Sequence, residues 1–202
     1  MSIEKTHTLL SHHLPELAVP YCTELWHQYR FIIRISKKRV TKLGDYKFDH
    51  DNNVHHISVN RNLNPYNFLI TYIHEVAHCV NVIRNGRGVS PHGKGWKSIF
   101  RELMLPLLNP DAFPDDVLRV LAKHMKNPKA SSQSDQQLVM VLRKYDEQIN
   151  HKLLIELPSG KSFKFNKRVF EKIKLRRSRV LCKEVRTGRN YLISAVAPIE
   201  EL

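Results

Sequence analysis

The sequence has few cysteines, no long apolar run and comparatively few acidic residues. Its three cysteines, Cys22, Cys79 and Cys182, are far apart and form no Cys-x-x-Cys pair, which excludes a disulfide framework. No apolar run approaches the roughly eighteen residues that a membrane-spanning helix needs. The first residues contain no apolar signal core. These absences predict a cytoplasmic protein without disulfides or a membrane partner, with association to the nucleoid as an extension of that prediction.

The shortage of acidic residues leaves a strongly basic chain. The sequence has 33 Lys or Arg against 19 Asp or Glu, which gives a formal net charge of +14. A charge excess of this size favours an anionic polymer as partner, and nucleic acid is the most plausible one. A basic surface that only keeps the protein in solution explains the composition about as well.

One stretch carries recognisable chemistry. Residues 71–79 read Thr-Tyr-Ile-His-Glu-Val-Ala-His-Cys, which places His74, Glu75 and His78 in the order His-Glu-x-x-His. Positions four apart lie on the same face of an α-helix, so the two imidazoles can bind one metal ion. Glu75 lies beside that face and can reach a water on the metal. The motif predicts a zinc site with Glu75 as the general base.

The motif falls within a segment that has clear helix signals. Asn64 is a good N-cap, and Pro65 suits the first helical position, where its missing N–H costs nothing. Apolar residues then recur at helical spacing, and Gly86 and Gly88 mark the end. The segment predicts a helix from about Pro65 to about Arg84. Two histidines and a glutamate inside such a helix would be costly to bury without partners, which argues against a chance match.

A catalytic zinc usually has three protein ligands and an open fourth position. The metzincin pattern is excluded, because it needs Gly and His where this chain has Asn81 and Arg84. His92, after a Gly-containing loop, and Glu102, on a second predicted helix over Trp96–Leu105, are the candidates for the third ligand. Histidine is the commoner zinc ligand, so His92 is favoured and Glu102 stays as the alternative.

The combination of motifs is more specific than His-Glu-x-x-His alone. The chain resembles the SprT-like zinc metalloprotease family (bacterial SprT and Spartan-like proteins) in His74-Glu75-x-x-His78, Pro91-His92-Gly93 and Trp96-Lys97. The resemblance covers about residues 5 to 125. It implies a mostly helical, zincin-like domain with three histidine ligands to one catalytic Zn²⁺ and a glutamate base. It also implies an association with DNA, and through it a role in DNA–protein crosslink repair.

The rest of the chain completes an α+β fold. Three strand candidates at 31–36, 43–48 and 55–60 predict a small antiparallel sheet beside the zinc helix. A helical stretch from Glu4 to Arg30 is interrupted by Pro15 and Pro20. His55 and His56 are neighbours on the third strand and point to opposite faces, so a second metal site is not expected there.

The expected organisation has three segments. Residues 1–128 form the SprT-like metalloprotease domain, residues 129–150 a polar linker with a connecting helix, and residues 151–202 a small basic antiparallel β module. SprT proteins tend to carry a zinc ribbon in this last position. Cys182 alone cannot bind a structural zinc, which needs four ligands. The module is therefore expected to be ribbon-like and to lack metal ligands.

The basic charge is concentrated in this last module. Residues 151–202 contain thirteen Lys or Arg against five Asp or Glu, a net charge of +8 and more than half of the total excess. Alternation in Lys172-Ile-Lys-Leu-Arg176 predicts charges on one face of a strand, which would neutralise DNA phosphates without sequence preference. The predicted DNA contacts are Lys164, Lys167, Arg168, Lys172, Lys174, Arg176, Arg177 and Arg179.

Two functional classes remain open from the sequence. The first is a zinc-dependent endopeptidase that cleaves proteins bound or crosslinked to DNA. The second is a nucleic-acid-binding or transcription-associated factor with a structural zinc. A structural site usually has a fourth protein ligand and has no need of a carboxylate such as Glu75, which favours the enzyme. Hydrolysis of a small substrate is also compatible with the motif. Tyr72 and Arg84 lie on the zinc helix, but the sequence does not identify the residue that stabilises the oxyanion.

Overall fold

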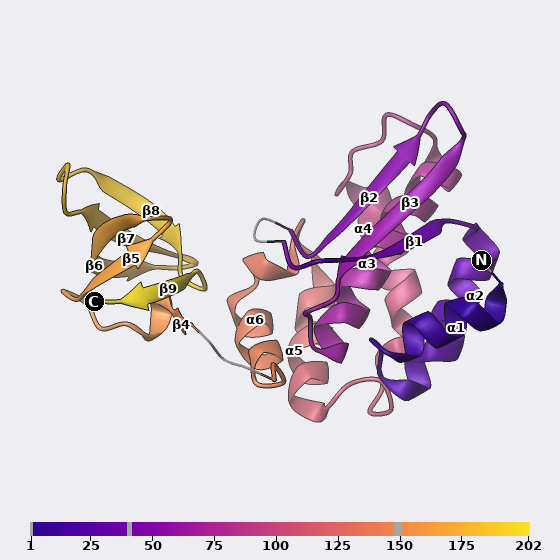
Figure 1. Ribbon diagram of the computed structural model, residues 1–202, viewed down its shortest axis with the longest axis horizontal. Helices are drawn as coiled ribbons and strands as arrows, with labels where there is room; N and C mark the ends of the chain where they lie inside the picture. Colours follow the sequence, from indigo (N-terminus) through magenta and orange to yellow (C-terminus); the bar gives the residue numbers. More distant parts are fainter. Residues whose placement is uncertain (1, 40–41, 148–150) are drawn as a thin grey trace. The chain divides into compact units, whose positions relative to one another are not determined.

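The computed structural model describes residues 2–39, 42–147 and 151–202. The chain divides into two compact units, Met1–Ala130 and Ser131–Leu202 (Figure 1). The first unit combines helices with a three-stranded sheet, and the second contains a six-stranded sheet. Residues 148–150 of the expected linker lie outside the described residues. Within the described ranges, no helix is both long enough and apolar enough to cross a bilayer.

The first unit begins with helices and then turns to strands. The two prolines divide the N-terminal helical stretch: Pro15 precedes a 3₁₀ turn, and Pro20 occupies the first turn of the next helix, where a missing N–H costs nothing. The elements of this unit are α1 (Ile3–Ser11), η1 (Glu16–Ala18), α2 (Val19–Tyr29), β1 (Ile32–Ser36), β2 (Gly44–Asp49), β3 (Val54–Asn60), α3 (Pro65–Asn85), α4 (Lys94–Met104), η2 (Leu105–Leu107) and α5 (Asp115–Lys126).

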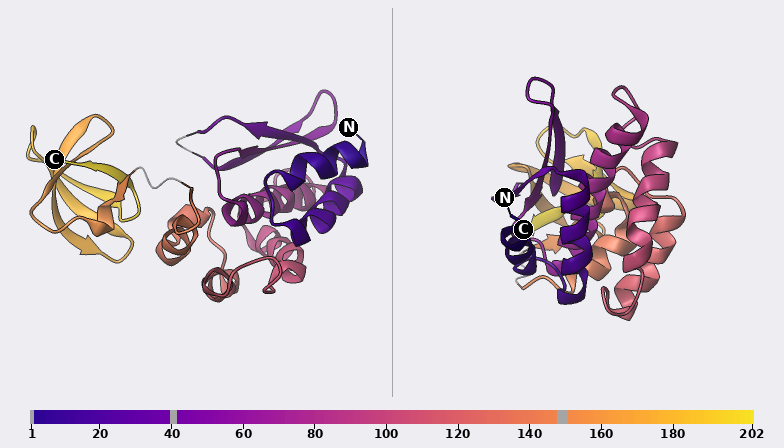
Figure 2. Two further views of the ribbon diagram at one scale, coloured as in Figure 1. Left: turned by 60° about the horizontal axis from the view of Figure 1, so that its bottom comes forward. Right: turned by 90° about the vertical axis from the view of Figure 1, so that its right-hand side faces the viewer.

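The three-stranded sheet is mixed, so the prediction of an antiparallel sheet is wrong for one strand. The strand order is β1-β3-β2, with β2 antiparallel to β3 and β1 parallel to β3. After β1 the chain passes to the far edge of the sheet before it forms the β2–β3 hairpin. The returning strand β3 therefore lies beside β1 and runs in the same direction. Figures 1 and 2 show the sheet along one side of α3, and Ile33, Ile57 and Val59 are buried on the sheet.

Helix α3 forms as its sequence predicts, and its end differs from the prediction by one residue. The side chain of Asn64 accepts a hydrogen bond from the backbone N–H of Asn67 at 2.9 Å, and Pro65 is the first helical residue. Gly86 ends the helix with a φ of 81°, a conformation that favours glycine. Between these ends, most of the helix surface is buried, including Phe68 and Tyr72. The helix is thus covered on several sides, which fixes its position.

Helix α4 packs closely on α3 and is anchored by the end of α5. A Cβ atom at Gly95 would lie only 3.0 Å from Asn81 Oδ1, so the glycine permits this approach of the two helices. Arg101 of α4 donates hydrogen bonds to the carbonyl oxygens of Met125 and Lys126, at 2.9 and 3.0 Å. These carbonyls are at the C-terminal end of α5, where helical carbonyls lack intrahelical partners. The loop between α3 and α4 is therefore fixed at both ends, because both helices are held in place.

The second unit is built on antiparallel strands in the order β4-β9-β5-β6-β7-β8. Its apolar core includes Phe163, Phe170, Val180 and Cys182. Figures 1 and 2 show that the strands of this sheet are strongly curved. Strand β9 was not predicted, because it begins with Pro198 and contains two glutamates. The elements are η3 (Ser132–Ser134), α6 (Gln136–Arg143), β4 (Lys152–Leu153), η4 (Leu154–Glu156), β5 (Ser162–Phe165), β6 (Arg168–Arg176), β7 (Arg179–Glu184), β8 (Asn190–Ser194) and β9 (Pro198–Glu201).

Lys172 is a structural residue of this unit. Its side chain is buried, and its ammonium group donates to the carbonyl oxygens of Leu154, Ile155 and Leu157 at 2.9, 3.1 and 2.5 Å. An irregularity in the pairing of β6 and β7 between Lys172 and Lys174 interrupts the alternation of the strand. The prediction that Lys172 shares an exposed basic face and contacts DNA is therefore wrong. All three donors of its ammonium group are used within the protein.

We expect Lys172→Met to lower the free energy of unfolding of the second unit by about 2–3 kcal/mol, because it removes three hydrogen bonds from a buried ammonium group to carbonyl oxygens. Both tryptophans of the chain, Trp26 and Trp96, lie in the first unit, so hydrogen exchange of peptides from residues 151–202 is the suitable measurement. Lys174→Met, at an exposed position of the same strand, should change stability by less than about 0.5 kcal/mol. Equal effects of the two variants would contradict this role of Lys172.

Candidate metal centre

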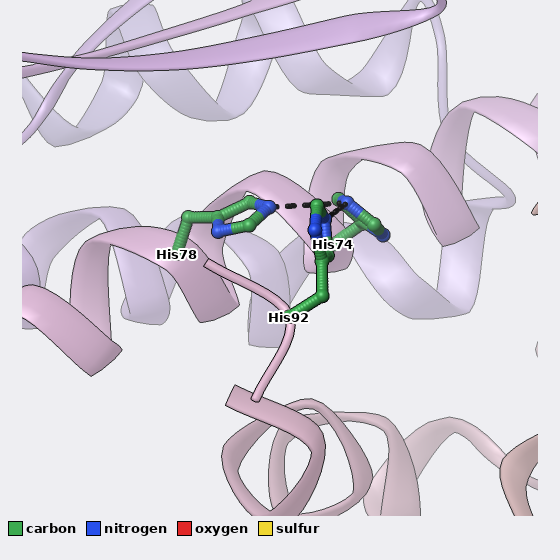
Figure 3. Close-up of side chains that lie close together, drawn as sticks. All are labelled: His74, His78 and His92. Atoms are coloured by element: carbon green, nitrogen blue, oxygen red, sulfur yellow. Dashed lines mark hydrogen bonds between the residues drawn. The ribbon is translucent and has the colours of Figure 1, made fainter. Parts of the chain in front are cut away.

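Three histidine side chains meet beside α3. His74 and His78 come from one face of α3, and His92 comes from the segment before α4 (Figure 3). The Nε2 atom of His74 lies 3.2 Å from that of His78 and 3.3 Å from that of His92. In the described parts of the chain, these histidines form the only group of three or more His, Cys, Asp or Glu side chains arranged to hold a metal ion.

The geometry of the three nitrogens fits a zinc ion. With Zn–N bonds of about 2.0–2.1 Å, a tetrahedral site places its ligand nitrogens about 3.3 Å apart. Burial lowers the pKa of His74 to about 3 and that of His78 to about 4, and it also lowers the pKa of His92. The imidazoles are therefore neutral at physiological pH and can offer a lone pair. A set of three neutral imidazoles is typical of catalytic zinc sites.

The loop and helix after α3 hold His92 in place. The backbone N–H of Gly93 bonds to the carbonyl oxygen of Ser90 at 3.1 Å, and a Cβ atom on Gly93 would lie 2.9 Å from Ser90 Cβ. The fully buried indole ring of Trp96 packs against the imidazoles, with ring centroids 4.6 Å from His74 and 4.9 Å from His92. This packing restricts the orientations of the rings before any ion binds.

Glu75 directly follows His74 on α3 and is buried. Its carboxylate packs on β2, where a Cβ atom at Gly44 would lie 2.5 Å from Glu75 Oε1. Within the described residues, no hydrogen bond to this carboxylate is found. Burial, with a smaller contribution from Asp45, raises the pKa of Glu75 to about 8. A divalent cation on the neighbouring histidines would favour the ionised form instead.

The structure removes three candidates that the sequence had left open. Glu102, the alternative third ligand, forms an ion pair with Arg84 at 2.7 and 2.8 Å and is not part of the histidine cluster. The same ion pair occupies Arg84. The hydroxyl of Tyr72 is buried and donates to the carbonyl oxygen of Cys22 at 2.8 Å. Neither Arg84 nor Tyr72 is therefore free to stabilise an oxyanion.

Sequence reasoning missed residues that the fold brings to the site. The ring of Tyr46 lies nearly parallel to that of His78, with centroids 6.1 Å apart and an interplanar angle of 12°. The charge of His124 contributes to the lowered pKa of His74, after burial and the charges of His78 and His92. The period-2 pattern of β2 places Gly44 and Tyr46 on one face, but it does not reveal which element that face contacts.

The cations predicted to bind DNA have several different environments. Arg168 bonds to Glu184 at 2.7 Å, its guanidinium lies 4.5 Å from the ring centroid of Tyr191, and Lys164 pairs with Glu200 at 3.3 Å. Lys172 is buried, as described above. The predicted cations that remain exposed, with no ion pair to another described residue, are Lys167, Lys174, Arg176, Arg177 and Arg179.

The ligand assignment predicts different effects of two substitutions. His92→Ala should weaken zinc binding by at least about tenfold, because it removes one of three ligands. Glu102→Ala should leave the zinc affinity unchanged, because its carboxylate is bound to Arg84 away from the cluster. Competitive titration of each metal-free variant with a chelator of known zinc affinity gives the comparison. The reverse ranking would move the third ligand to Glu102.

The burial of Glu75 predicts a pH-dependent effect in the metal-free chain. Its pKa is about 8 in the folded chain against 4.5 in the unfolded reference, so the stability contributed by the protonated form is complete below about pH 4.5 and is lost as the pH rises through about 8. Glu75→Gln does not titrate. Its stability relative to wild type should therefore increase by on the order of 3 kcal/mol between about pH 5 and pH 8.

This difference can be measured by urea denaturation of EDTA-treated proteins across that pH range. The histidine contributions are common to both proteins and cancel in the comparison. Glu102→Gln, a change at an exposed carboxylate, serves as the control. A stability difference between Glu75→Gln and wild type that does not vary with pH would show that Glu75 is not protonated in the metal-free fold.

Comparison with known proteins agrees with this geometry. The model of the SprT-like family matches residues 15–114, which include α2, the three-stranded sheet, α3, α4 and all three histidines. No curated protein and no solved structure matches the chain. The family match and the histidine cluster agree with a metalloprotease type of site that can bind a metal ion. The chain belongs to the SprT-like family.

Proposed function

We propose that the protein is a zinc-dependent endopeptidase. The observation that carries the proposal is a buried carboxyl group, Glu75, with no hydrogen-bond partner among the described residues, directly after His74 on the helix that supplies two of the three converging imidazoles. A buried carboxylate is costly unless another group compensates its charge. Beside a divalent cation and a water molecule, that cost is offset and the group can act as a base.

The roles of the residues follow from their positions. His74, His78 and His92 would hold one Zn²⁺, which supplies Lewis acidity for a peptide carbonyl and lowers the pKa of water. Glu75 takes a proton from the attacking water and passes it to the leaving amine. The close contact with Gly44 fixes the Glu75 side chain. A metal ion held by only these three side chains would have room for the reacting groups.

A structural zinc in a nucleic-acid-binding factor is the competing function. Such a site needs four protein ligands. Among the described residues, the cluster provides three. In a structural site Glu75 would be a buried carboxylate with no role, and its burial would only lower the free energy of unfolding. The enzyme is the better explanation of the same geometry.

For the substrate, we infer proteins bound or crosslinked to DNA, which makes crosslink repair the role of the enzyme. The inference rests on the net charge of +14 and on a basic hairpin of the second unit, formed by Lys174, Arg176, Arg177 and Arg179 at the β6–β7 turn. These exposed cations can neutralise phosphates in any sequence. In the first unit, Lys37 and Lys38 are also exposed, while Arg39 bonds to Asn60 and Ser58. This function requires a cytoplasmic location with access to the chromosome.

Glu75→Gln tests the catalytic assignment. The variant should retain zinc, because its ligands are unchanged, and should lose hydrolysis of a DNA-bound protein by several orders of magnitude, because the base is gone. Metal analysis and a cleavage assay on the same preparation give both quantities. Glu102→Gln is the matched control and should cleave at the wild-type rate. Wild-type cleavage by the zinc-loaded Glu75→Gln variant would refute the enzymatic function.

The role of the basic hairpin in DNA binding is tested by substitutions that remove its charges and keep the fold. Replacing Lys174, Arg176, Arg177 and Arg179 together with glutamine should weaken DNA binding and reduce the slope of log affinity against log salt by about 2 to 4. DNA titrations at several salt concentrations measure this slope.

The control for the hairpin variant removes the same charge from exposed positions elsewhere in the second unit, by glutamine at Lys161, Lys183, Arg186 and Arg189. It should change the slope by less than half as much as the hairpin variant. If the hairpin variant and the control variant change the slope equally, DNA binding depends on overall charge and not on the hairpin. If neither changes the slope, the DNA-contacting surface lies on the first unit around Lys37 and Lys38.

A further inference from the structure

The face of β2 that contacts α3 can be assigned from its glycine. Gly44 lies so close to α3 that a Cβ atom there would be 2.5 Å from Glu75 Oε1 and 2.7 Å from Thr71 Cγ2. Side chains two residues apart on a strand lie on the same face. Tyr46 therefore faces α3 as well, and its ring lies against His78, four residues after His74. The strand thus places a phenol beside one of the candidate metal ligands.

The hydroxyl of Tyr46 has a defined partner. It lies 2.8 Å from Nδ1 of His55 on the neighbouring strand β3, and the two rings stack with centroids 5.9 Å apart. The ring of Phe48 packs on His55 at a centroid distance of 4.8 Å and holds it in place. Tyr46 is half-buried, so part of the residue remains exposed. The fold therefore holds a phenol in one orientation between two imidazoles.

We propose that Tyr46 donates a hydrogen bond to the oxyanion that forms when the peptide carbonyl is attacked, and that His55 positions the Tyr46 hydroxyl. This inference rests on the proposed peptidase function. Attack on a carbonyl moves negative charge onto its oxygen, and enzymes stabilise that charge with donors that are already oriented. Tyr46 comes from a different element than the metal ligands, so it can approach the substrate from another side.

Other donors near the histidines are less suitable. Tyr72 and Arg84 are bound to Cys22 and Glu102, as described above. The indole N–H of Trp96 has no partner among the described residues, but the ring is fully buried against the histidines and cannot meet a substrate. Of the donors considered, Tyr46 is the one that is both next to a ligand and partly accessible.

His55 can accept from the phenol or donate to it, depending on which ring nitrogen carries the proton. With the proton on Nδ1, His55 donates to the phenol oxygen and leaves the phenol hydrogen free for the oxyanion. A side-chain amide can make the same donation. His55 therefore acts as a positioning residue, and asparagine should replace it better than an apolar ring does.

The test compares Tyr46→Phe with wild type and with Tyr29→Phe, a control on α2 whose hydroxyl accepts from Arg84 away from the site. Tyr46→Phe keeps the ring against His78 and removes only the hydroxyl. It should lower kcat by about 10²-fold, as expected for the loss of one oxyanion donor, with KM and zinc content unchanged. Binding of a phosphonamidate peptide, which carries a tetrahedral oxyanion, should weaken by a similar factor, while binding of an uncleavable ground-state peptide should not.

A purely structural role of Tyr46 predicts different results. It would weaken both peptides equally or lower the zinc content, and either outcome would overturn the proposal. A kcat of Tyr46→Phe equal to wild type would overturn it too, without affecting the proposed function. A wild-type protein that is loaded with zinc and cleaves no DNA-bound protein would overturn both. For His55, kcat should fall in His55→Phe and recover at least partly in His55→Asn. Wild-type kcat in His55→Phe would overturn its positioning role.

Discussion

The close approach of β2 to α3 at Gly44 is the constraint on which the candidate site depends. Any side chain at position 44 would collide with the Glu75 carboxylate and with Thr71, so the sheet can reach this distance only because a glycine is there. The approach buries Glu75, and it also fixes the height of the strand above the helix. Tyr46 then lies beside His78, and one short strand sets the surroundings of both Glu75 and His78.

This burial has an energetic consequence for the first unit. The ordinary stabilisation of a helix comes from apolar surface, but α3 also carries a buried glutamate and two half-buried histidines. Desolvation disfavours the charged form of each group, so the metal-free fold holds neutral imidazoles and a carboxyl that resists ionisation. This desolvation lowers the stability of the metal-free fold, but it leaves neutral imidazoles that can bind a cation. Pre-formed binding sites in general exchange stability for function in this sense.

The parts of the structure that the sequence predicted are those that local interactions determine. Helix α3 follows from the cap at Asn64, the helical spacing of apolar residues and the terminal glycine, all within one segment. The His92 position in the cluster was favoured from ligand chemistry and the family resemblance. The prediction of an antiparallel sheet was wrong because strand order depends on how the chain crosses the sheet between strands, and no short sequence pattern shows this. Tyr46 was missed, and Lys172 was wrongly assigned to DNA binding, for a similar reason, since their partners are not adjacent in the sequence.

Lys172 also gives the second unit an independence that a metal-stabilised module lacks. Its ammonium group connects β6 to the turn that contains Leu154 and Leu157, as a bound ion connects the loops of a small domain. This connection is part of the covalent chain, so it cannot be lost by dilution, chelation or oxidation of a ligand. Removal of a metal ion from the histidine cluster would therefore affect the first unit and leave the fold of the second unchanged.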